Sequence, residues 1–510
     1  MAVLRKSTAE LRKPANARTR QAVGMPTETP GSAHVPSPAN APSSAETPGP
    51  ANTRRGRPAA RRAAARLRGA ALDTRPLGVP AFRRLLAGQG LAYIGTMITE
   101  VAVPLQVYRL THSSLYVGLA GLVGLAPLVV FGLYGGAIAD RVDRRRLYVV
   151  SATVTWAVTL ALFAQALAGA TSVGLLLGLV ALQAAAFAVS SAARGAIIPR
   201  VVPAALVPAA NTLNYTAGNL GQVAGPLVAG VLVGLPHGFA WAYGVDAVLF
   251  TALLYSTVRL PPLRRATELP QRGGVRMVWD GLRFIGSHPV LWMSFAADIA
   301  AMVLAMPTAL FPEAAATRFH GGAGLLYSAV AVGSLLAAAF SGWIGKVSRQ
   351  GRALTVAVAA WAAAIAAAGA TDSLTLTVGL LICAGAADLV SAVYRQTILQ
   401  TYAPDEMRGR LQGVFTVVVA GGPRLGDLRA GAMASATGIT LAWSGAALAC
   451  LLLVVAAALA VRPFWRYAAS SAPQASPVPP ASSAPSASPA SSASSDDALP
   501  RSQTVHEAGR

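Results

Sequence analysis

The residues of this 510-residue chain that could do chemistry are charged side chains inside long apolar runs. Glu100 lies about 15 residues into the first run and Asp298 about nine residues into the seventh. At 1.5 Å per residue, these positions lie roughly 22 Å and 13 Å along a helix, on either side of the middle of a bilayer core roughly 30 Å thick. A charge at that depth costs roughly 2.5–3.5 kcal/mol, and intramembrane carboxyl groups often serve proton relays.

Two later runs each carry an acidic and a basic residue. Asp388 and Arg395 are seven residues apart in the tenth run, which places them on one face of a helix. Arg424 and Asp427 are three residues apart in the eleventh run, close enough to pair locally. We therefore expect two intramembrane charge pairs. The alternative for all these charges, Glu100 and Asp298 included, is that they are paired and purely structural.

The sequence lacks the motifs of metal sites, nucleophilic catalysis and phosphate binding. The six histidines show no His-Glu-x-x-His or Cys/His spacing for a metal, and no Gly-x-Ser-x-Gly nucleophile motif occurs. Gly345-Lys346 is followed by Val347, so no phosphate-binding loop is present. Cys383 and Cys450 lie in different apolar runs, where we expect small buried residues rather than a disulfide. We expect neither an enzyme nor a resident metal or cofactor.

The composition indicates a membrane protein. Hydrophobic residues make up 54% of the chain and charged residues 12%, whereas a soluble globular protein has roughly 25% charged residues. Each apolar run is about as long as the roughly 20 residues that a membrane-spanning helix needs. We expect an all-α membrane protein with twelve spans. They are predicted at about 85–108, 115–139, 147–168, 172–197, 209–235, 238–258, 289–313, 323–345, 352–370, 374–397, 411–435 and 438–461.

Basic residues are concentrated in every second connection between these spans. The basic connections contain Arg141, Arg144, Arg145 and Arg146, then Arg200, then Arg259, Arg264, Arg265, Arg272, Arg276 and Arg283, then Lys346, Arg349 and Arg352, then Arg408 and Arg410. The other connections carry little beyond Arg109 and Arg318. Cytoplasmic loops carry an excess of Lys and Arg, so both termini are predicted to be cytoplasmic.

The chain divides into five parts by composition. Residues 1–82 are basic and rich in Pro, Ala and Arg, and 467–510 are rich in Ala, Ser and Pro, so both are expected to be disordered tails. Two six-helix bundles, 83–258 and 289–466, are expected on either side of a basic cytoplasmic linker, 259–288. An internal repeat supports the two halves, because Gly136–Asp140 matches Gly342–Lys346 and Arg194–Pro203 matches Arg395–Pro404.

The connection after the second span carries a motif. Gly136, Asp140, Arg141, Arg144 and Arg145 resemble the Gly-x-x-x-Asp-Arg-x-Gly-Arg-Arg loop signature of the major facilitator superfamily, with Asp143 in place of the second glycine. The resemblance implies that this loop acts as a conformational switch.

The fifth span contains Gly221, Gly225, Pro226 and Gly230 at spacings similar to the Gly-x-x-x-Gly-Pro motif of the family's antiporters. Close helix packing explains these small residues almost as well.

The segment from Asp388 to Gly431 resembles one branch of this superfamily more specifically. Asp388 through Arg395, Pro404 through Arg410, and Gly426 through Gly431 are similar to the branch of bacterial enterobactin-type siderophore exporters and macrolide-type drug exporters. The resemblance covers about 83–466. It implies two pseudo-symmetric bundles whose first, fourth, seventh and tenth helices line a cavity, which makes Glu100 and Asp298 the best proton-coupling candidates.

The expected function is proton-coupled efflux of an amphipathic small molecule by alternating access. The expected partners are that substrate, protons and the lipid bilayer, with no nucleic acid, in a protein that acts as a monomer in the bacterial cell membrane. An importer or a lysolipid flippase on the same scaffold is the main alternative. A non-transporting membrane scaffold is a weaker one.

Overall fold

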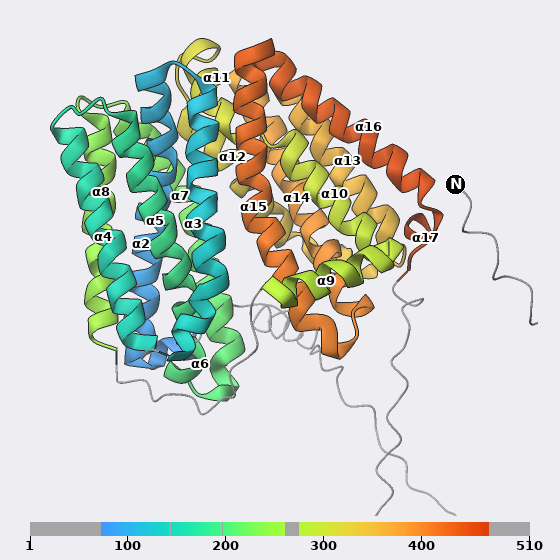
Figure 1. Cartoon of the computed structure of the whole chain (residues 1–510), viewed down its shortest axis with the longest axis horizontal. Helices are drawn as coiled ribbons and strands as arrows, with labels where there is room; N and C mark the ends of the chain where they lie inside the picture. The colour runs from blue at the N-terminus through green and yellow to red at the C-terminus, as the bar shows by residue number, and fades with distance from the viewer. Residues whose placement is uncertain (1–72, 142–143, 196, 261–274, 469–510) are drawn as a thin grey trace, which may run out of the picture. The chain divides into compact units, whose positions relative to one another are not determined.

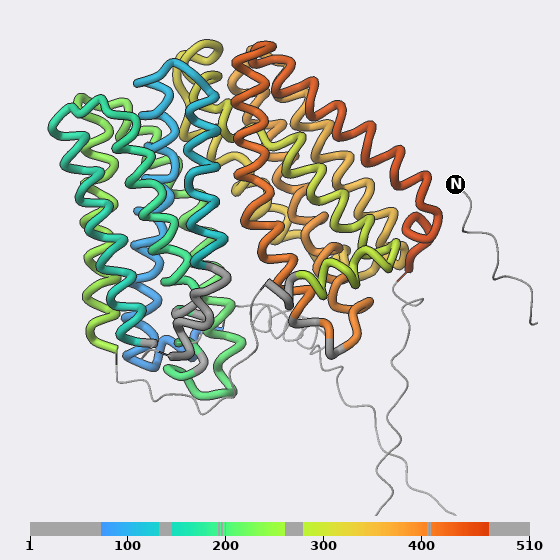
Figure 2. Tube along the Cα trace, viewed as in Figure 1, coloured from blue at the N-terminus to red at the C-terminus, as the bar shows by residue number. Residues whose placement is uncertain are grey.

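The computed structural model describes residues 73–141, 144–195, 197–260 and 275–468, and all regular elements in these ranges are helices (Figures 1 and 2). The tail predictions for 1–72 and 469–510 lie outside the described residues, as does the middle of the linker, 261–274. Within the described ranges the helices form two halves that follow one another along the chain.

The first half contains six long helices. They are α2 (Pro80–Thr111), α3 (Ser114–Arg141), α4 (Arg144–Leu167), α5 (Val173–Gly195), α7 (Val207–Val233) and α8 (Gly238–Val258). Short helical turns accompany them at η1 (Arg75–Gly78), α6 (Ile198–Val201) and η2 (Ala204–Leu206).

The second half begins after α9 (Val275–Ser287). Its elements are α10 (Pro289–Ala305), η3 (Thr308–Leu310), α11 (Phe311–Thr317), α12 (Ala323–Ala339), η4 (Ser341–Lys346), α13 (Gln350–Gly369), α14 (Leu374–Tyr402), α15 (Asp405–Thr437), the π-helical η5 (Leu441–Gly445), α16 (Ala446–Ala460) and α17 (Arg462–Trp465). Helices α10 and α11 with η3 replace the single seventh span expected from the sequence, and the break lies at Pro307.

The same helix pairs pack together in both halves. In the first half α2 packs on α7 and α8, α3 packs on α5, and α4 packs on α5 and α8. In the second half α10 packs on α15 and α16, α12 packs on α14, and α13 packs on α14 and α16. This correspondence confirms the two pseudo-symmetric six-helix bundles. Helix α3 contacts α15 and helix α7 contacts α12, and these pairs join the halves (Figure 1).

Ten of the described helical segments are long and apolar enough to cross a membrane, and α12 is a shorter apolar helix. Helix α15 has 33 residues, but Arg424, Asp427 and Arg429 lie in its second half and lower its hydropathy. With α12 and α15 the described segments account for the twelve predicted spans.

Residues 73–82, which the sequence assigns to the tail, include described helical structure before the predicted boundary at residue 83. Helix α2 begins at Pro80, and the η1 turn precedes it with Pro76 buried. Leu77 and Val79 pack against a cluster that includes Phe82 and Ile198. Apolar side chains in an otherwise basic segment therefore extend the first half to these residues.

The helices are connected differently at the two ends of the bundles. Every described residue with a positive φ lies in the connections α2–α3, α4–α5, α7–α8, α11–α12 or α15–α16, and these are His112, Gly169, His237, His320, Gly321, Gly322 and Gly438. A left-handed residue reverses the chain within a few residues. We call this end the short-turn end. The opposite end, where the Arg-rich connections lie, is called the basic end.

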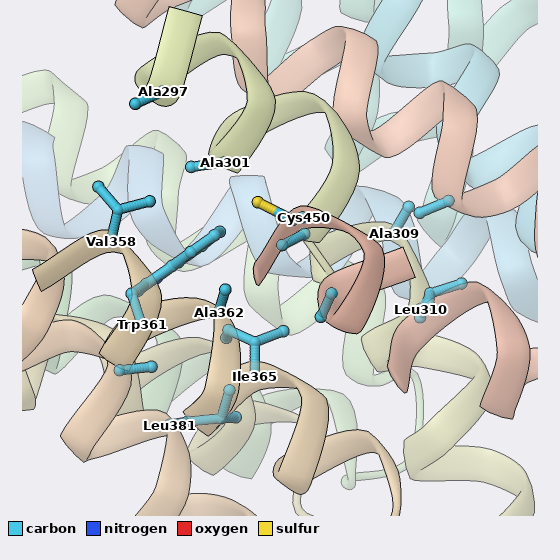
Figure 3. Close-up of a cluster of buried hydrophobic side chains, with 14 of the residues drawn as sticks. Ala297, Ala301, Ala309, Leu310, Val358, Trp361, Ala362, Ile365, Leu381 and Cys450 are labelled. Atoms are coloured by element: carbon cyan, nitrogen blue, oxygen red, sulfur yellow. The ribbon is translucent and has the colours of Figure 1, made fainter. Parts of the chain in front are cut away.

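The largest core cluster lies mostly in the second half (Figure 3). It brings together Ala301 of α10, Trp361 and Ile365 of α13, and Cys450 of α16. Cys450 is buried and Cys383 is exposed, and neither forms a disulfide. The expectation of a small buried residue is therefore confirmed for Cys450 and wrong for Cys383.

Candidate functional site

A cavity of about 880 Å³ is lined by residues of both halves. Helices α2, α3 and α5 contribute on one side, and α10, α14 and α15 contribute on the other. The ionisable acidic and basic side chains on its wall are Glu100, Arg194, Asp298, Asp388, Arg395, Arg424 and Asp427. All six residues predicted from the sequence as proton-coupling candidates or intramembrane pairs therefore reach one site.

Asp298 of α10 forms an ion pair with Arg395 of α14. The side chains are 1% and 6% exposed, so the pair is shielded from water. Asp388, the predicted partner of Arg395, lies 4.0 Å from its guanidinium and is 45% exposed. The predicted Asp388–Arg395 pair is thus the outer and weaker contact of Arg395, because Asp298 comes in from a neighbouring helix.

Glu100 of α2 faces Arg424 of α15 across the cavity, with 3.8 Å between Oε1 and Nη2. Both side chains are partly exposed, at 53% and 39%. This contact joins the two halves. Among the described residues no ion pair within 4.0 Å joins Arg424 to Asp427, because Arg424 turns toward Glu100 and Asp427 accepts a hydrogen bond from the backbone of Ala309.

Asp427 and Arg429 form hydrogen bonds with backbone groups at the interruption between α10 and α11. Asp427 Oδ1 accepts a hydrogen bond from the Ala309 backbone N–H at 3.1 Å. Arg429 donates to the carbonyl oxygens of Val303 at 3.0 Å and Met306 at 3.4 Å, and to that of Ala442 at 2.8 Å. A helix that breaks at membrane depth must have its freed backbone groups satisfied by neighbours. Both charges therefore have a structural partner.

Close contacts join the halves near the short-turn end. The Ser114 hydroxyl at the start of α3 donates to the Glu313 carboxylate of α11. A side chain on Gly431 of α15 would collide with the Ser114 backbone, and one on Gly118 of α3 would come within 2.9 Å of the Leu428 Cα atom. Small residues at these positions let α3 and α15 approach closely.

The predicted antiporter-like motif of α7 has two packing roles. A Cβ atom at Gly221 or Gly225 would collide with Tyr93 or Met97 of α2, so these glycines serve packing within the first half. A Cβ atom at Gly230 would come within 2.8 Å of the Gly324 Cα atom of α12, which belongs to the second half. Pro226 is buried and lines the cavity.

Comparison with known proteins decides the family. Residues 72–484 match the family of major facilitator transporters described as "Transmembrane secretion effector". The chain belongs to this family.

Curated relatives of this transporter are bacterial exporters. The enterobactin exporter EntS of Citrobacter koseri is 28% identical over 352 residues, covering 68% of this chain and 83% of that protein. Enterobactin exporter EntS of Shigella boydii serotype 18 is 27% identical over 351 residues, covering 68% and 83%. These matches place the transporter in the enterobactin-exporter-like branch, as the sequence motifs indicate.

Solved structures share the fold of this transporter. The nucleoside transporter NupG superposes with a TM-score of 0.61 at 15% identity, covering 76% of this chain and 99% of that one. A bacterial homologue of the iron transporter ferroportin gives 0.57 at 15% identity, covering 76% and 99%. With the family match, this shared fold makes the chain a multi-pass membrane transporter of the major facilitator fold.

The predicted switch motif lies at the basic end of this transporter. Gly136, Asp140 and Arg141 belong to the end of α3, and Arg144 begins α4. Their side chains lie outside the described part of the structure, so the switch role stays a prediction.

Two charged residues of the transporter were given no role from the sequence. Asp246 of α8 is 1% exposed and accepts hydrogen bonds from Thr99 at 2.6 Å and Thr159 at 3.5 Å, which gives this buried acid polar partners in α2 and α4. Arg194 of α5 lines the cavity. Its repeat relation to Arg395 was the available signal for its position.

Proposed function

We propose that this transporter exports an amphipathic small molecule by alternating access, driven by proton exchange. The Glu100–Arg424 contact carries the proposal, because it is a water-accessible acid–base pair that joins the two halves across the cavity. The bacterial exporters among its relatives support the outward direction.

The cavity wall favours an amphipathic substrate. Apolar side chains such as Phe187, Met302 and Trp361 share the wall with the charged residues. A volume of about 880 Å³ lies within the usual range of small-molecule sites, and a mainly apolar wall with a few polar groups fits a molecule of mixed character.

Proton coupling would act through the Glu100–Arg424 ion pair between the halves. Protonation of Glu100 neutralises the carboxylate and removes its attraction to Arg424. The halves could then separate at this point, and release of the proton would restore the pair. Asp298 has less access to water and pairs within its own half, so it is the second proton-coupling candidate.

The packed glycines suggest how access alternates. Helices α3 and α15, and α7 and α12, contact one another near the short-turn end through small residues. We infer that these contacts close the short-turn end while the cavity is reached from the basic end. Rocking of the two halves would exchange the closed and open ends.

The basic connections support a cytoplasmic basic end with both termini on that side. We also propose a monomer in the bacterial cell membrane, because each chain holds both halves of its cavity.

Transport into everted membrane vesicles tests the proposal. The probes are ethidium and 8-anilinonaphthalene-1-sulfonate, an amphipathic cation and anion, with and without nigericin to collapse the pH gradient. We expect gradient-dependent accumulation of at least one probe, and its loss in Glu100→Gln. Vesicles without the transporter are the control. Accumulation that ignores the gradient would refute proton coupling, and none beyond the control would refute export of such molecules.

A further inference from the structure

We propose that Arg194 binds an oxyanion of the transported solute, such as a carboxylate, phosphate or sulfonate. The inference rests on the proposed transport of an amphipathic solute and defines the class of its polar group. It assigns to α5 a substrate-binding residue at the basic end of the cavity.

Arg194 lies in the last turn of α5 and is half-buried. It lines the main cavity and also a smaller adjoining pocket of about 170 Å³ formed with α2 and α7. A solute that enters the cavity can therefore reach the guanidinium while its apolar part remains in the larger space.

The charges of the cavity leave Arg194 without a carboxylate partner. Arg395 pairs with Asp298, and Arg424 pairs with Glu100. Among the described residues no carboxylate oxygen lies within 4.0 Å of Arg194, and the smaller pocket contains no acidic residue. A half-buried cation without a counter-charge attracts an anion from solution.

The internal repeat explains why the partner is missing. Arg194 corresponds to Arg395 at a sequence offset of 201, and the other repeated motif has an offset of 206. At these offsets the counterpart of Asp298 falls within residues 92–97 and that of Asp388 within residues 182–187, and neither range contains an acidic residue. The second half neutralises its arginine internally, whereas the first half leaves the equivalent charge available.

The surroundings of Arg194 suit an oxyanion. The smaller pocket is also lined by Gln89, Tyr93 and Gln222. Gln89 donates to the Tyr148 hydroxyl at 3.2 Å and Gln222 donates to the Tyr93 hydroxyl at 3.1 Å, which fixes both amides in place. Guanidinium and amide groups together offer several N–H donors, and a guanidinium binds an oxyanion through two parallel hydrogen bonds.

Calorimetric binding to the full-length transporter in phosphatidylcholine nanodiscs tests the assignment without a proton gradient. The probes are naphthalene-1-sulfonate and the neutral naphthalene-1-sulfonamide, which have the same ring and nearly the same size. We expect the wild type to prefer the sulfonate. In Arg194→Gln we expect sulfonate affinity to fall about ten- to hundredfold, as for loss of hydrogen bonds to a charged group, with the sulfonamide almost unaffected.

Two variants separate binding from folding. Arg194→Lys keeps the charge and should retain part of the sulfonate preference. Arg462→Gln removes an exposed arginine of α17 outside the cavity lining and should bind both probes as the wild type does. Equal binding of both probes by the wild type would overturn the assignment, and so would equal losses of both probes in Arg194→Gln. Neither result bears on proton coupling, which the vesicle assay tests separately.

The oxyanion could belong to a solute or to a lipid headgroup. Nanodiscs that contain phosphatidylglycerol distinguish the two sources. Unchanged sulfonate affinity in these discs supports a solute anion, whereas competition that disappears in Arg194→Gln shows that the same subsite takes the lipid phosphate. Competition of equal size in Arg194→Gln would show that sulfonate binds elsewhere and would overturn the assignment.

Discussion

Removing the carboxylate of Asp298 is expected to destabilise the protein, because it takes away the main partner of a buried arginine. The Asp298→Asn substitution keeps the size of the side chain, so it creates almost no void. It leaves Arg395 buried at 6% exposure, with Asp388 at 4.0 Å as the nearest remaining carboxylate. The perturbation is therefore electrostatic.

The size of the effect follows from the burial of the pair. Breaking a buried ion pair by removing one partner costs about 3–5 kcal/mol, because the other charge stays uncompensated. The distant Asp388 compensates Arg395 in part, which favours the lower end of that range. For a protein of this size we expect the apparent melting temperature to fall by roughly 3 to 5 °C.

The assay is thermal unfolding of purified protein in detergent, followed by fluorescence-detected gel filtration. Asp298→Asn and Arg395→Gln should each lower the melting temperature, and the double variant should recover most of the loss because no buried charge is left alone. Efflux per folded molecule is measured in parallel across pH. A structural pair lowers protein yield and leaves the pH profile of the folded fraction unchanged.

Two results would refute this reasoning. If Asp298→Asn has the same melting temperature as the wild type, Asp298 does not stabilise the buried charge of Arg395. If the double variant is no more stable than either single variant, the two charges are not energetically coupled. A stable Asp298→Asn protein whose efflux no longer responds to pH would instead identify Asp298 as the coupling acid.

Three further outcomes are expected. Glu100→Gln should lose pH-dependent efflux while stability changes by less than about 1 kcal/mol, because its ion pair is half-exposed; unchanged pH dependence in the same assay would contradict the coupling role. Gly230→Val should separate α7 from α12 and lower the yield of a disulfide cross-link engineered across the short-turn end. Gly178→Val, with open space around it, should leave that yield unchanged. Equal cross-linking in both variants would contradict the packing argument. In a cysteine-free background, His320→Cys should react with an impermeant maleimide in intact cells and Arg272→Cys should not; the reverse would invert the topology.

The sequence alone determined that the chain has a membrane fold and that this fold is divided into two similar halves. Span positions depend on runs of apolar residues, and orientation is predicted from the arginines between them, so both are local properties of the chain. The repeat joining Arg194 to Arg395 predicted two similar halves, and the matching helix pairs confirm them. The break at Pro307 was visible only as a proline in an apolar run, because neighbouring helices decide whether such a residue bends or interrupts a span.

The tertiary structure decided which charges meet. Sequence spacing identifies neighbours three, four or seven residues apart on one helix, and it therefore suggested Arg424 with Asp427. Packing instead brings Glu100 to Arg424 and Asp298 to Arg395, pairs separated by 324 and 97 positions in the sequence. Because a buried charge is stabilised by whichever opposite charge or backbone dipole the fold places beside it, the partner of each intramembrane residue depends on helix packing rather than on its position in the sequence.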